Sequence, residues 1–124
     1  MSQQIRITVG DSSYAAELND SPTAKAIYDA LPIKGSGSRW GEEIYFAIGV
    51  DEKLAPGARD EVEVGGLAYW PPGKAFCIFF GPTPASVGDE PRAASEVNHV
   101  GRIVDDVSSL TSAPNGVQVV IEPV

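Results

Sequence analysis

The stretch Gly65–Thr83 decides the fold and reads Gly-Gly-Leu-Ala-Tyr-Trp-Pro-Pro-Gly-Lys-Ala-Phe-Cys-Ile-Phe-Phe-Gly-Pro-Thr. Two strand-like runs, Leu67–Trp70 and Ala75–Phe80, flank a Pro-Pro-Gly turn. Every residue of Ala75–Phe80 is apolar, which is typical of a strand that is covered on both faces. The stretch therefore predicts the central hairpin of a small, closed β-barrel.

Alternating apolar residues predict further strands on both sides of this hairpin. These strands are Gln4–Val9, Ser13–Leu18, Glu43–Val50, Glu61–Val64, His99–Val104 and Val117–Val124. The glycine-rich segment Ile33–Trp40 is either a flexible loop or a sharply bent strand. Ala85–Asn98 is polar and interrupted by Gly88 and Pro91, so we expect a long surface connection. About eight short strands favour closure of the sheet, because closure removes exposed edges.

Two short segments are predicted to be helical. Ser21-Pro22 is a helix start, because Ser caps free N–H groups and Pro fits the first helical position. An apolar stripe follows at helical spacing, formed by Ala24, Ile27, Tyr28 and Leu31. We expect this helix to cover one mouth of the barrel. Asp105–Ala113 is expected to make a helical turn that points Val107 and Leu110 inward.

Composition bounds the class of protein. The 124 residues, 43% apolar and 21% charged, predict one domain spanning 1–124. A formal charge of -8 argues against nucleic-acid binding, which needs clustered Lys and Arg. The single Cys77 excludes a disulfide framework, and the longest apolar run is too short to span a bilayer. We therefore expect a soluble cytoplasmic protein without membrane contact. The sequence does not indicate its oligomeric state.

Three segments in order carry a resemblance to a known family. They read Trp40-Gly-Glu-Glu-Ile-Tyr-Phe46, Gly66-Leu-Ala-Tyr-Trp-Pro-Pro-Gly73 and Phe79-Phe-Gly-Pro-Thr-Pro84. These resemble the cyclophilin-like domain family of small uncharacterised bacterial and archaeal proteins, and Asn98–Ile103 is similar to the late Gly-Lys/Arg-Val strand of cyclophilins. The resemblance covers nearly the whole chain. It implies an eight-stranded barrel with a helix at each end, and no known activity.

Candidate functional residues are aromatic and basic side chains near predicted turns. Aromatic rings with a polar edge suit small-ligand or peptide binding, and a guanidinium can hold a carbonyl or carboxylate. The predicted groove consists of Arg39, Trp40, Tyr45, Tyr69, Trp70, Lys74, His99 and Arg102. Simpler interpretations are surface ion pairs for the arginines, a hydrogen-bonded strand residue for the histidine, and core packing for the hairpin. One His and one Cys argue against a His-based metal site, and no cofactor signature is present in the sequence.

Three functional hypotheses follow. The leading one is a binding module for an unidentified small molecule or peptide. The alternative is a degenerate peptidyl-prolyl cis-trans isomerase, because true cyclophilins are prolyl isomerases and the reaction needs no cofactor. The Phe-His-Arg and Gln-Gly-Gly segments of cyclophilins are missing here, and Arg39-Trp40 and Arg102 are similar to them in residue type only. The third is a structural or self-associating protein, since fold alone does not fix function.

Overall fold

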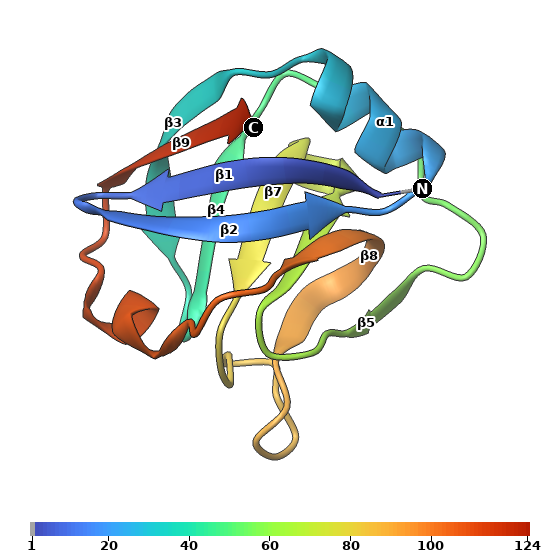
Figure 1. Ribbon diagram of the computed structural model, residues 1–124. Helices are drawn as coiled ribbons and strands as arrows, with labels where there is room; N and C mark the ends of the chain where they lie inside the picture. Colours follow the sequence, from blue (N-terminus) through green and yellow to red (C-terminus); the bar gives the residue numbers. More distant parts are fainter. Residues whose placement is uncertain (1) are drawn as a thin grey trace.

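The computed structural model describes residues 2–124, and Figure 1 shows how its elements are arranged. Strands dominate the described chain, and short helices connect some of them. The elements are β1 (Gln3–Val9), β2 (Ser12–Leu18), α1 (Pro22–Asp29), β3 (Ile33–Arg39), β4 (Glu43–Ala47), β5 (Arg59–Glu61), β6 (Gly66–Trp70), the 3-10 helix η1 (Pro71–Gly73), β7 (Ala75–Phe79), β8 (Arg92–Ile103), the 3-10 helix η2 (Ser108–Ser112) and β9 (Val117–Pro123).

Eight of the strands form one ring-like sheet of antiparallel pairs (Figure 1). Their order is β2-β1-β9-β3-β4-β7-β6-β8, and an additional pairing of β2 with β8 brings the sheet back to its first strand. The short strand β5 pairs only with the first half of β8 and adds a ninth strand beside the ring. The predicted mainly-β fold class is confirmed.

The hairpin predicted as the centre of the fold lies where expected. β6 pairs with β7, and β7 also pairs with β4, so β7 has a neighbour on both edges. All five residues of β7 are buried, which confirms that both faces of the strand are covered. Phe76 and Ile78 belong to the main core inside the ring, whereas Cys77 and Phe79 belong to a second, smaller cluster.

Helix α1 and helix η2 cover the main core from different sides (Figure 1). Ser21 caps α1 as predicted, because its hydroxyl accepts a hydrogen bond from the N–H of Ala24 at 3.2 Å. The predicted apolar stripe packs on the core, with Ala24 and Ile27 fully buried. Leu110 and Val107 are also buried, as the sequence pattern predicted for the segment before β9.

The second cluster lies on the outer face of β6 and β7. It consists of Val62, Ala68, Ala75, Cys77, Phe79, Ala93 and Val97. Ala93 and Val97 come from the first half of β8, which pairs with β5 and places apolar side chains against this face. The sheet therefore has a core on each side in this region, and that explains why β7 has no polar residue.

One prediction is wrong in part: Ala85–Asn98 is not a surface connection throughout. β8 begins at Arg92, immediately after Pro91, and runs on to Ile103. Its first half buries few side chains and carries small or polar residues elsewhere, so the alternation that marks a strand is weak. Only the part of the segment before Arg92 is the predicted connection.

Other boundaries also differ from the predictions. The strand predicted at Glu61–Val64 lies at Arg59–Glu61 in the structure, so the two overlap at Glu61 alone, and Val64 is 60% exposed. β4 ends at Ala47, before the residues that lead into the following loop. For Ile33–Trp40, where two interpretations were open, the structure shows a strand. A Cβ atom on Gly35 would lie 2.4 Å from the Phe46 ring, so the glycine allows that ring to pack against the backbone.

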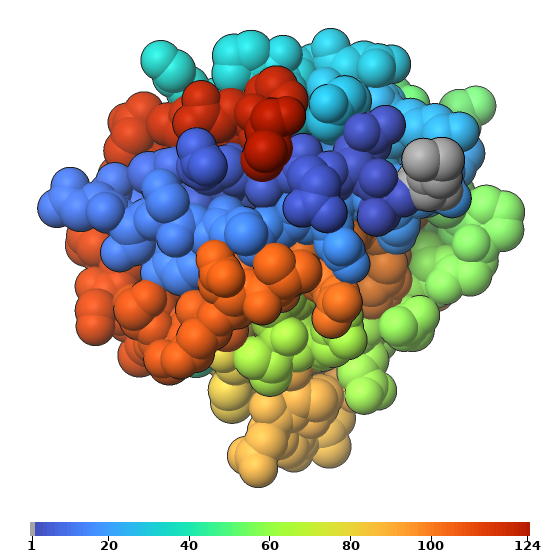
Figure 2. Space-filling view, viewed as in Figure 1, coloured from blue at the N-terminus to red at the C-terminus, as the bar shows by residue number. Residues whose placement is uncertain are grey.

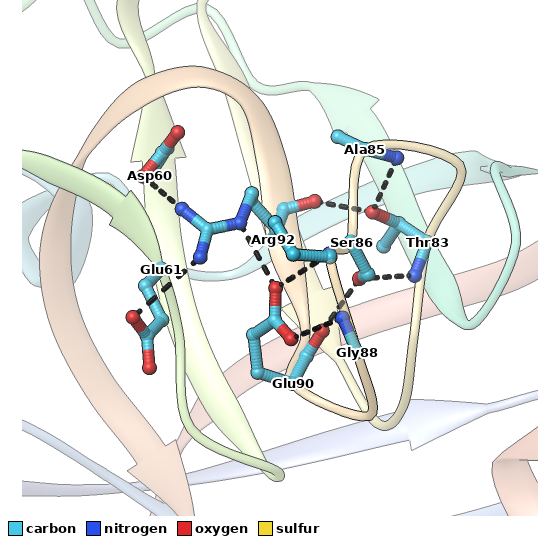
Figure 3. A network of polar contacts seen from close by, with 9 residues as sticks. Asp60, Glu61, Thr83, Ala85, Ser86, Gly88, Glu90 and Arg92 are labelled. Atoms are coloured by element: carbon cyan, nitrogen blue, oxygen red, sulfur yellow. Dashed lines mark hydrogen bonds and ion pairs between the residues drawn. The ribbon is translucent and has the colours of Figure 1, made fainter.

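The connection before β8 protrudes from the body of the protein (Figure 2). Figure 3 shows how Arg92 holds it in place. The Arg92 guanidinium donates to Glu90 at 3.0 Å and to Asp60 at 2.7 Å, and lies 3.6 Å from the carboxylate of Glu61. Backbone N–H groups of the loop, first that of Val87, lower the pKa of Glu90 to about 2. This network joins the loop, β5 and the start of β8.

Asn98 connects three segments of the chain in the interior. It is 2% exposed, donates to the Thr23 hydroxyl at 3.0 Å and to the Lys53 carbonyl at 2.9 Å, and accepts from the Ala55 N–H at 2.8 Å. We expect Asn98→Ala to lower the free energy of unfolding by about 2–3 kcal/mol, because it leaves buried groups without partners. Urea denaturation measures this. Gln118→Ala, at an exposed position of β9, should change it by less than about 0.5 kcal/mol.

Candidate functional site

An aromatic pocket of about 220 Å³ lies on the outer face of the ring. We use the name aromatic pocket for the hollow lined by Trp40, Glu43, Tyr45, Trp70, Cys77, Ala93 and Ala94. These residues come from the β3–β4 turn and from β4, β6, β7 and β8. The site is thus assembled from five separate parts of the chain.

The register of β4 and β7 explains why these side chains meet. Tyr45 lies opposite Cys77, and Glu43 lies opposite Phe79. Ile44 points to the main core, so its neighbours Glu43 and Tyr45 point to the outer face because side chains alternate along a strand. Glu43, Tyr45 and Cys77 therefore share the face that carries the pocket.

The two tryptophans are placed by their own backbone and side-chain contacts. Trp40 lies in the turn between β3 and β4, where its N–H donates to the carbonyl of Glu43 at 3.0 Å. Trp70 ends β6, and its indole N–H donates to the hydroxyl of Ser95 on β8 at 2.7 Å. This bond fixes the position of the Trp70 ring relative to the wall formed by Ala93 and Ala94. The pocket is therefore preorganised on that side.

Glu43 is the acidic group of the aromatic pocket, and it is 4% exposed. Burial raises its pKa to about 7, and a hydrogen bond with the Cys77 thiol acts in the opposite direction. Burial also raises the pKa of Cys77, and the nearby charge of Glu43 adds to this effect. The thiol is therefore protonated at neutral pH, which disfavours it as a nucleophile. Glu43 can hold or release a proton near neutral pH.

A second hollow, the polar pocket, has a volume of about 320 Å³. It is lined by Ser2, Glu17, Leu18, Asn19, Arg59, Glu63, Gly66, His99, Gly101 and Arg102. Arg102 is paired with Glu17 at 3.1 Å, so part of its charge is already balanced. Burial lowers the pKa of His99, and the charge of Arg59 lowers it further. Within residues 2–124, Nε2 of His99 is buried and has no hydrogen-bond partner.

Comparison with known proteins places the chain in a family. Residues 3–122 match the family described as Cyclophilin-like. The chain belongs to the cyclophilin-like family. A hypothetical protein from Archaeoglobus fulgidus, known from a solution structure, is 43% identical and superimposes with a TM-score of 0.83 over 98% of this chain and 95% of that chain. A search among curated proteins found no match.

The fold of this cyclophilin-like protein brings together three of the predicted groove residues. Trp40, Tyr45 and Trp70 line the aromatic pocket, whereas His99 and Arg102 line the polar pocket. Five members of the predicted groove are thus divided between two hollows, and the other three line neither of them.

In this cyclophilin-like protein, the side chain of Arg39 is held by contacts with other parts of the chain. Its guanidinium donates to the carbonyls of Gly41, Thr111 and Ala113 and pairs with the Glu42 carboxylate at 2.9 Å. It also lies 5.1 Å from the centre of the Phe80 ring. These contacts connect the β3–β4 turn to the segment around η2, and they use all three guanidinium nitrogens.

Tyr69 and Lys74 lie outside both pockets. Tyr69 is fully buried in the main core, and its hydroxyl donates to the Val50 carbonyl and accepts from the N–H of Glu52. Lys74 adopts a left-handed backbone conformation with φ of 48° after η1, and its ammonium is 3.8 Å from Asp51. Both residues support the hairpin and the loop after β4.

Sequence reasoning missed Glu43 and assigned Cys77 to packing. Glu43 occupies the first position of β4, two residues before Tyr45. Because side chains two residues apart on a strand point to the same face, the sequence could have indicated that Glu43 and Tyr45 share a face. Its burial could not be read from the sequence, because Trp70 and the alanines of β8 that line the same pocket are distant from it along the chain.

Among residues 2–124, no three His, Cys, Asp or Glu side chains lie together as metal ligands would. None of the helices in this part of the chain has the length and apolar character needed to cross a membrane.

Proposed function

We propose that this protein is a binding module, in which a closed barrel filled by side chains carries a ligand site on its outer surface. The ligand is a small molecule or peptide, and one of its apolar groups enters the aromatic pocket. The observation that carries the proposal is the convergence of Trp40, Tyr45 and Trp70 around a buried carboxyl group, Glu43. Apolar walls with one well-placed polar group are the usual composition of a ligand site.

The dimensions support recognition of one chemical group rather than of a whole large ligand. Complete ligand pockets in proteins span roughly 300–1,000 Å³, whereas the aromatic pocket encloses about 220 Å³. It fits a group of side-chain size, and the rest of the ligand lies on the surrounding surface. Burial of apolar area at about 25 cal/mol per Å² then supplies part of the affinity.

No contact of the site favours the isomerase alternative. That hypothesis relied on an arginine beside an apolar pocket. Arg39 is held by backbone carbonyls and Glu42, and Arg102 lies in the polar pocket. Neither guanidinium lines the aromatic pocket, so the binding hypothesis has the stronger support.

Trp70→Ala is the substitution that tests the proposal most directly. We expect fragments found by an NMR screen of the labelled protein to shift residues of the aromatic pocket. Trp70→Ala should weaken their binding at least about tenfold, because a large, immobilised contact surface is lost. Titrations followed by amide chemical shifts measure the affinity.

Arg102→Ala is the control, because this side chain lines only the polar pocket. It should leave the affinity of the same fragments unchanged. Fragments that shift only polar-pocket residues, lose affinity in Arg102→Ala and keep it in Trp70→Ala would contradict the proposal.

A further inference from the structure

We infer that the group recognised by the aromatic pocket is a cation, namely an alkylated ammonium held between three aromatic rings and the carboxylate of Glu43. This inference rests on the proposed function and names the chemical class of its ligand. It is carried by the residues that meet in the pocket: Trp40, Tyr45, Trp70 and Glu43.

Aromatic rings are the first part of the argument. The face of an aromatic ring carries partial negative charge, and a cation within about 6 Å of the ring centre is attracted to it. Tryptophan provides the strongest such surface, and the pocket has two tryptophans and a tyrosine. The bond from the Trp70 indole N–H to Ser95 uses the edge of this ring and leaves its faces free of that contact.

The charge of the lining is the second part. Among the described residues that line the aromatic pocket, Glu43 is the acidic group, and the lining includes no Lys, Arg or His. An anionic or strongly acidic ligand would meet an uncompensated carboxylate there. The formal charge of -8 for the whole chain also favours the approach of a cation.

The apolar walls indicate an alkylated ammonium rather than a bare one. A primary ammonium group, –NH3+, has three N–H donors and a strongly held hydration shell. Ala93, Ala94 and Cys77 fill most of the remaining lining and offer few acceptors for such donors. Alkyl groups replace the N–H donors and spread the charge, so the cost of leaving water is lower and the alkyl groups contact the walls.

Proton binding at Glu43 gives the inference a measurable signature. The titratable groups that face Glu43 in the pocket are Cys77 on β7 and Tyr45 on β4, while β6 and β8 contribute Trp70 and alanines. Glu43 has a pKa of about 7, so it is mostly neutral at pH 6 and mostly ionised at pH 8. A cation binds the ionised form, and its affinity should rise about tenfold between these pH values.

The test uses choline and its neutral carbon isostere, 3,3-dimethylbutan-1-ol, titrated against the labelled full chain at constant ionic strength. We expect choline to shift aromatic-pocket residues, to bind at least tenfold more tightly than the isostere at pH 8, and to gain about tenfold in affinity from pH 6 to 8. Glu43→Gln should remove this pH dependence and the preference for choline. The comparison of the two probes on the wild-type chain needs no variant, so it holds even if Glu43→Gln does not fold.

Two outcomes would overturn the inference. If choline and the isostere bind equally in the aromatic pocket at both pH values, the cation inference fails and the proposed function stands. If choline does not shift the aromatic pocket at all, the inference fails as well. The fragment screen with Trp70→Ala then decides separately whether the pocket binds neutral ligands.

Discussion

Gly101→Ala is expected to lower the free energy of unfolding by about 3 kcal/mol or more, because there is no space for a methyl group at this position. A Cβ atom there would lie 2.0 Å from the carbonyl oxygen of Glu17 and 3.0 Å from the Cα of Leu18. Both atoms belong to the backbone of β2, so no side-chain rotation can relieve the overlap. Urea denaturation followed by circular dichroism measures the loss.

The position of Gly101 makes this effect a test of the ring itself. Gly101 lies opposite Leu18 on β2 and opposite Leu67 on β6, at the pairing that returns the sheet to its first strand. That β2–β8 pairing covers three residue pairs, so a displacement of one of them disturbs a large part of the contact. We therefore expect the alanine variant to loosen the ring at its β2–β8 junction.

Gly88→Ala is the matched control for Gly101→Ala. Gly88 lies in the protruding connection before β8, and a Cβ atom there would lie 3.4 Å from a flexible side-chain oxygen of Glu90. We expect a change of less than about 0.5 kcal/mol. Equal stability of the two variants would show that β2 and β8 are not as close as the structure has them.

The sequence predicted those parts of the fold that depend on local pattern. Alternation in the first two strands and the last strand places Ile5, Ile7 and Val119 in the core, as the structure confirms. The continuous apolar run of β7 also indicated a strand covered on both faces. In these cases the side chains on one segment are enough to define which face is buried.

The start of β8 could not be predicted in the same way. Arg92–Val97 has only Ala93 and Val97 as its buried side chains, and its pairing partner β5 is three residues long. Its strand conformation depends on contacts with Val62 and Phe79, which are distant in the sequence. A local pattern contains no information about these partners.

The candidate site shows the same limit. The sequence singled out Trp40, Tyr45 and Trp70 by residue type, and the ring places them in one pocket. Glu43 was not singled out, and the adjacent Glu42 is an acidic residue at the same turn. Only strand register and the cover from β8 make Glu43 buried and leave Glu42 paired with Arg39.

Glu43→Gln is expected to stabilise the protein above neutral pH. The folded state raises the pKa of Glu43 from 4.5 to about 7, so the folded protein binds this proton more tightly than the unfolded chain does. The free energy of unfolding of the wild type should therefore fall as the pH rises from about 4.5 through 7, by about 3 kcal/mol from this group. Glutamine resembles the protonated acid and does not titrate. The variant should match the wild type near pH 4 and exceed it by up to about 3 kcal/mol at pH 8, as measured by urea denaturation at each pH.

Glu96→Gln provides the control, because it removes an exposed carboxylate of β8 and should not produce a stability difference that grows with pH. If the free energies of unfolding of Glu43→Gln and the wild type differ by the same amount at every pH from 4 to 8, Glu43 is not held in a desolvated position.

A difference that grows with pH would mean that the unliganded protein retains a destabilising carboxylate in its aromatic pocket at pH 8. A cation that pairs with this carboxylate would offset part of that cost, so choline should raise the stability of the wild type at pH 8 and have little effect on Glu43→Gln. The stability measurement and the binding measurement thus test the same carboxylate by independent means.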